Sequence, residues 1–108
     1  MVRYVVTLRE VFDMGSTDHV WVLDDPREAF EKYSDLITKT LRELKIFNIH
    51  CESEEMSRSH VLVALHKNGM RRVDEDDVDS AVCIRIDVGD PDTCTRWDRI
   101  ICIAEVYV

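Results

Sequence analysis

An acidic run beside a pair of arginines is the first stretch of this sequence that could do chemistry. Five carboxylates occupy the six positions from Asp74 to Asp79, directly after Arg71 and Arg72. A second acidic stretch follows from Asp87 to Asp92. Clustered carboxylates can bind a divalent cation, can present negative charge to a basic protein surface, or can form a solvated turn between two strands.

The spacing of these carboxylates does not favour a metal site. A calcium loop of the EF-hand type alternates its oxygen ligands, then has a glycine, and ends on a glutamate at position 12. Neither acidic stretch follows that pattern. Zinc needs four ligands at short spacing, whereas His60 and His66 would lie about 20 Å apart along a strand. We therefore predict no metal and no other cofactor.

Cysteines, serines and histidines supply nucleophiles and bases, but no local motif joins them. The candidate nucleophiles are Cys51, Cys83, Cys94, Ser57 and Ser59, with His50 or His60 as the base. The chain has only three glycines, so it has neither a glycine-rich nucleophile elbow nor a phosphate-binding loop. The sequence therefore favours a protein that is not an enzyme.

A tryptophan among charged residues could anchor a partner protein. Trp97 follows Arg96 in the last loop, and these are residue types that dominate interface hot spots. Alternatively, Trp97 folds over the sheet and covers the core. Both interpretations stay open, and we predict a partner-binding surface made of Asp74, Glu75, Asp76, Asp77, Asp79, Asp90, Asp92, Arg96 and Trp97.

The elements that must position these residues begin with a hairpin and a helix. Apolar residues alternate from Val2 to Leu8, which predicts strands over 2–12 and 19–24 around a turn. Asp25 and Pro26 then form a typical helix start, and apolar residues recur every three or four positions after it. These signals predict an amphipathic helix over residues 26–45.

The second half of the chain is predicted to be mostly strands. Alternating patterns indicate strands over 46–53, 82–88 and 99–108. Residues 59–68 fit two structures, because Asn68-Gly69 can be the turn of a hairpin or the end of a helix with Gly69 as its left-handed cap. The alternation of Val61 and Val63 favours the hairpin.

The fold class follows from this order of elements. We predict a single α+β domain over residues 1–108, in the order β-β-α-β-β-β-β, with the helix packed on one face of a twisted antiparallel sheet of five to six strands. The other face must be polar or must meet a partner. The last strand has apolar residues on both of its faces, including Ile101, Ile103 and Tyr107. This pattern suggests either a central strand or a homodimer interface.

Charge and cysteine content narrow the partners. Residues 74–98 contain nine acidic and two basic residues, and so carry −7 of the net charge of −8. This disfavours direct binding to nucleic acid or to anionic membranes. The N-terminus alternates and carries a charge at Arg3, unlike a signal peptide, so we predict a cytoplasmic protein with four reduced cysteines.

The leading hypothesis is a small acidic, non-enzymatic protein-binding module. A specific version is an inhibitor, of the kind that viruses and mobile elements encode, whose carboxylates occupy a basic nucleic-acid-binding groove of its target. The alternative is a small-ligand binder or enzyme that uses the sheet face not covered by the helix, with His50, His60 or Cys51 as polar groups.

Overall fold

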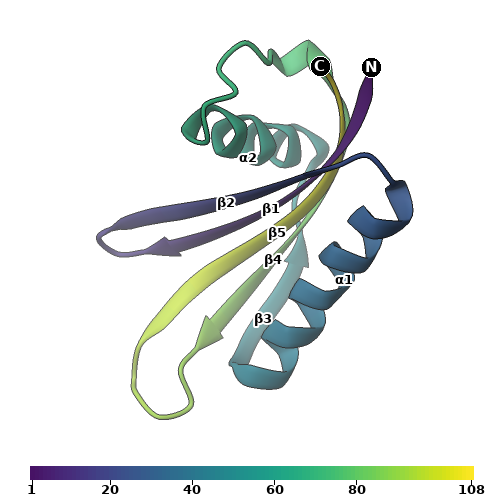
Figure 1. Cartoon of the computed structure of the whole chain (residues 1–108). Coiled ribbons are helices and arrows are strands. Elements are labelled where there is room, and N and C mark those ends of the chain that lie inside the picture. Colours follow the sequence, from purple (N-terminus) through teal and green to yellow (C-terminus); the bar gives the residue numbers. More distant parts are fainter.

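The chain opens with the predicted hairpin, β1 (Val2–Phe12) and β2 (Gly15–Leu23), in a computed structural model that describes all 108 residues (Figure 1). The elements that follow are α1 (Pro26–Glu43), β3 (Lys45–Cys51), α2 (Glu54–Lys67), a short 3₁₀ turn η1 (Glu75–Asp77), β4 (Val78–Gly89) and β5 (Arg96–Tyr107). Together they form a single α+β domain, which confirms the predicted fold class.

The sheet has five antiparallel strands in the order β2-β1-β5-β4-β3. The two helices pack on opposite faces, because successive side chains of a strand point to opposite sides. On β5, Ile100 and Cys102 belong to the core cluster that contains Val61 and Leu65 of α2. Ile101, between them, belongs to the cluster that packs against α1.

Helix α1 begins as predicted. The Asp25 carboxylate accepts a hydrogen bond of 2.9 Å from the Arg27 backbone N–H, and Pro26 occupies the first turn. The buried side of the helix includes Ala29 and Thr40. Arg99 of β5 donates to the Thr40 hydroxyl at 3.0 Å, so a polar contact accompanies the apolar packing.

The prediction of a strand at residues 59–68 was wrong, because this segment belongs to helix α2. Ser53 caps its first turn by accepting a hydrogen bond of 3.2 Å from the Met56 N–H. The buried face carries Val61, Ala64 and Leu65 at helical spacing, preceded by the polar Ser57 and His60. The element order is therefore β-β-α-β-α-β-β, and both sheet faces carry a helix instead of one.

The prediction of four reduced cysteines was also wrong. Cys83 of β4 and Cys102 of β5 lie directly opposite each other in the register and form a disulfide. Both residues are buried, so the bond lies between the sheet and α2. Cys51 and Cys94 are free and exposed.

The last strand is central, as one of its two interpretations required. β5 is flanked by β1 and β4, and Ile101 is fully buried. Tyr107, at the end of β5, is 46% exposed, so its apolar ring is only partly covered. The central position of β5 accounts for its apolar residues without a homodimer, which stays a prediction. Neither helix combines the length and the apolar character that crossing a membrane would require.

Candidate binding pocket

The predicted partner-binding surface is divided between the two ends of the sheet. Asp74 to Asp77 lie at or beside η1, next to the chain termini, and Asp79 is the second residue of β4 (Figure 1). Asp90 and Asp92 lie in the β4–β5 loop at the opposite end, and Arg96 begins β5. The twelve residues of β4 separate the two groups by about 35 Å. They cannot contact one small partner surface together.

The acidic residues at the η1 end are solvated. Asp74, Glu75, Asp76 and Asp79 are exposed, and none of them belongs to an ion pair. The Asp77 carboxylate accepts a hydrogen bond of 2.8 Å from the Asp74 N–H, which closes the turn. No three carboxylate, cysteine or histidine side chains of the molecule come together as metal ligands would.

The residues at the β4–β5 end are occupied by contacts within the chain. Arg96 donates two hydrogen bonds to Asp87, at 2.6 and 3.1 Å, and these bonds lower the pKa of the Asp87 carboxyl. Trp97 packs on the core cluster under α1 and against Phe12, with 5.7 Å between ring centroids. Trp97 therefore covers the core, which was one of its two interpretations.

A sheltered polar cluster contains two of the residues of the alternative hypothesis. The Glu52 carboxylate lies 3.2 Å from His60 Nε2, 3.0 Å from Arg85 Nε and 3.7 Å from His50 Nε2. Burial raises the pKa of Glu52, but the bonds with His60 and Arg85 outweigh it and the pKa is lowered. For His60, burial disfavours the charged imidazolium, and so it lowers the pKa of this histidine. None of these residues lines one of the main cavities. Through Glu52, the cluster connects His60 of α2 to Arg85 of β4.

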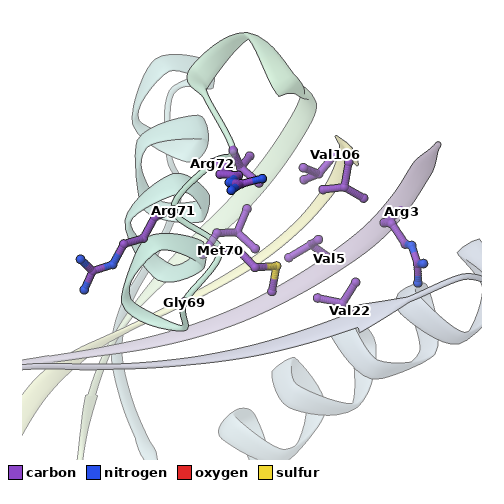
Figure 2. Close-up of a pocket in the computed structure, with 11 residues that line it drawn as sticks. Arg3, Val5, Val22, Gly69, Met70, Arg71, Arg72 and Val106 are labelled. Carbon is purple, nitrogen blue, oxygen red and sulfur yellow. The ribbon is translucent and has the colours of Figure 1, made fainter.

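The largest cavity, which we call the terminal pocket, lies beside the chain ends and has a volume of about 540 Å³ (Figure 2). Most of its lining is apolar and comes from β1, β2, β5, α2 and the loop after α2. The apolar residues are Val5, Val22, Leu65, Met70, Val73, Val106 and Val108, and the others are Arg3, Gly69, Arg71 and Arg72.

The end of α2 positions the loop that borders this pocket. Gly69 has a φ of +94°, and its N–H donates to the His66 carbonyl at 3.2 Å. The Met70 N–H donates to the Leu65 carbonyl at 2.9 Å. This is the Schellman arrangement, which also brings the side chains of Met70 and Leu65 together. The helix ending therefore places both residues in the pocket lining.

A second contact holds the loop after the helix. His66 Nε2 lies 2.7 Å from the carbonyl oxygen of Val73, and Val73 is buried. The loop is thus attached to α2 on both sides of Arg71 and Arg72. The backbone around the pocket is held by these bonds without a ligand.

The three arginines of the lining differ in their surroundings. Arg3 pairs with Asp24 at 2.7 Å. Figure 2 shows Arg71 pointing away from the other lining residues, whereas Arg72 borders the pocket together with Met70 and Val106. Neither Arg71 nor Arg72 has a carboxylate partner. Arg72 is therefore the positive group that is available to a molecule in the pocket.

Sequence reasoning missed the terminal pocket. Its lining comes from both ends of the chain and from residues 69–73, and only the strand register and α2 bring these segments together. The one local signal was Asn68-Gly69, which we predicted to be a hairpin turn in preference to a helix end. Comparisons with models of known families, with curated proteins and with solved structures find no match to this chain, so its function is argued from these residues.

Proposed function

We propose that this chain is a non-enzymatic binding protein whose ligand occupies the terminal pocket. The observation that carries the proposal is an apolar cavity of about 540 Å³ with an arginine, Arg72, that has no carboxylate partner. Ligand sites in proteins are usually concave and mostly apolar, with a few polar groups that fix orientation. The terminal pocket has this composition.

The anchoring of the pocket supports the same proposal. The Schellman bonds of Gly69 and Met70, and the bond between His66 and Val73, order the loop in advance. A site that is already ordered loses less conformational entropy when a ligand binds. By contrast, the Glu52 cluster offers no comparable cavity, so we do not propose an enzyme.

The experiment is a titration with N-phenyl-1-naphthylamine, a neutral dye that fluoresces in apolar surroundings. Met70→Trp fills the pocket with a larger side chain, and we expect it to weaken dye binding about tenfold or more, because lost apolar burial of that size is worth over 1 kcal/mol. The matched control is Met56→Trp, which changes an exposed methionine of α2 outside the pocket. Equal dye binding by both variants, with circular dichroism unchanged, would contradict the proposal.

A second candidate function is protein binding through the acidic η1 end. The observation that favours it is the exposure of Asp74, Glu75 and Asp76, whose carboxylates have no basic partner in the chain. Its narrower form, an inhibitor that occupies a basic nucleic-acid-binding groove, has less support. Such an inhibitor needs a long row of charge, and here about 35 Å separates the two acidic groups.

Affinity capture from lysate at low and high salt tests this second candidate. Reversing Asp74, Asp76 and Asp77 to lysine should remove a basic partner that is retained only at low salt, because salt screens exposed charges. Reversing Asp90 and Asp92, at the other end, is the control. Unchanged capture of the partner by the variant with Asp74, Asp76 and Asp77 reversed would contradict this candidate function.

A cytoplasmic location also remains a proposal. The two free cysteines, Cys51 and Cys94, are compatible with it, because thiols stay reduced in the cytosol. The Cys83–Cys102 disulfide counts against it, because such bonds are rare in most cytosolic proteins. We also propose that the protein binds neither nucleic acid nor anionic membranes directly, because its net charge is −8.

A further inference from the structure

We propose that the terminal pocket binds an anionic amphiphile: an aliphatic chain that ends in a carboxylate or phosphate group. This inference rests on the proposed function and adds the class of ligand. It rests on three features: the aliphatic side chains of the lining, the unpaired arginine at the border of the pocket, and the acidic residues beside that arginine.

The apolar part of the lining selects the body of the ligand. Its seven apolar residues are aliphatic, apart from the thioether of Met70, and no lining side chain carries a hydroxyl, amide or aromatic ring. A sugar or a nucleobase has polar groups around its ring, and those that face the aliphatic side chains would lack hydrogen-bond partners, which costs free energy on burial. A nucleobase would also find no aromatic side chain to stack on. A hydrocarbon chain needs neither.

The free cation selects the head group. Arg72 lines the pocket with Met70 and Val106, and it has no acidic partner (Figure 2). The planar guanidinium can donate two parallel hydrogen bonds to a carboxylate or to a phosphate. Arg3 is already neutralised by Asp24, and the Arg71 side chain points away from the other lining residues. One positive group is therefore available for the head.

The acidic neighbourhood makes the contact with Arg72 decisive. Asp74, Glu75 and Asp76 come shortly after the arginines in the chain, and all three are exposed and unpaired. Their field repels any anion at the border of the pocket, so an anionic head is held there through its hydrogen bonds with Arg72. A phosphate monoester carries roughly two charges at pH 7, so both its attraction to Arg72 and its repulsion by the acids are about twice those of a carboxylate. The experiment below distinguishes the two head groups.

Displacement of the naphthylamine dye by decanoate, 1-decanol and decyl phosphate tests this inference, with each amphiphile below its micelle concentration. We expect decanoate to bind about tenfold more tightly than 1-decanol, since a hydrogen-bonded charge pair is typically worth that much. Arg72→Gln should remove this preference by lowering the affinity for decanoate to about that for 1-decanol. Arg42→Gln, which changes an exposed arginine of α1 outside the pocket, is the control and should keep the preference.

The outcomes separate this inference from the proposed function. Dye binding with equal affinity for decanoate, decyl phosphate and 1-decanol would overturn the anionic head and keep the pocket. Tighter binding of decyl phosphate than of decanoate would assign a phosphate head, and the reverse order a carboxylate. Failure of the dye itself to bind would overturn the proposed function. An undiminished decanoate preference in Arg72→Gln would overturn the role of Arg72.

Discussion

At the scale of single residues, the terminal pocket depends on one backbone conformation. Gly69 is in the left-handed region, with a φ of +94°, and this conformation lets Met70 return to Leu65. A Cβ at position 69 would meet no atom within 4 Å. Any penalty for a side chain there is consequently one of backbone strain and not of a clash.

We expect Gly69→Ala to lower the free energy of unfolding by about 1 kcal/mol, because alanine resists the left-handed region. Gly69→Asn should cost less, since asparagine tolerates this conformation better. Urea unfolding at pH 7 measures both. Equal stability of Gly69→Ala and the parent chain would show that the loop does not need positive φ.

The polar cluster at Glu52 makes stability depend on pH. Burial lowers the pKa of His60 below its usual 6.5, so the unfolded chain binds a proton more readily than the folded chain. Stability should therefore fall as the pH drops below about 6.5. The positive charges of Arg9 and Arg85 add to this effect, because they oppose protonation of His60.

Glu52 should add a second decrease at lower pH. Its folded pKa lies below the usual 4.5, so its contribution is present above pH 4.5 and is lost as the pH falls through the folded value. Urea unfolding from pH 7.5 to pH 3 measures both steps, and His60→Gln should remove the upper one and reduce the lower one, because the bond with His60 helps to lower the pKa of Glu52. An identical pH slope between 7 and 5.5 in His60→Gln would contradict the assignment.

At the scale of elements, the two helices differ in how much of their signal is local. Helix α1 was predicted because Asp25 and Pro26 mark its start and its apolar stripe is continuous. In α2 the buried face begins with Ser57 and His60, so its apolar period is interrupted. The β-branched Val61 and Val63 then resemble a strand. The pocket could not be predicted, because it needs both α2 and the strand register.

The disulfide joins two neighbouring strands that the register already pairs. Cys83 and Cys102 are 19 residues apart, and closing a loop of that length stabilises a chain by about 3 kcal/mol through the unfolded state. We expect a reducing agent to lower the free energy of unfolding by that order. Cys51→Ala combined with Cys94→Ala should show the same difference, since these thiols are free. No effect of reduction would mean that the two cysteines are unpaired.

At the scale of the whole molecule, charge is arranged along the length of β4. The acidic η1 end and the β4–β5 loop lie at opposite ends of a domain whose longest dimension is 44 Å. Between them, Arg85 is paired with Glu52 and Asp98, and Arg96 with Asp87. The segment that carries −7 therefore forms two separate acidic ends, each with its own neighbours, and not one continuous surface.

This separation predicts that the two ends act independently. At physiological salt, exposed charges are screened beyond about 8 Å, which is far less than the length of β4. We expect Asp74→Lys with Asp76→Lys, and Asp92→Lys, to change the free energy of unfolding additively, to within about 0.5 kcal/mol. Urea unfolding of the two variants and their combination gives the coupling. A coupling above about 1 kcal/mol would require the two ends to share a contact, and the acidic segment would then again be a candidate for a single binding surface.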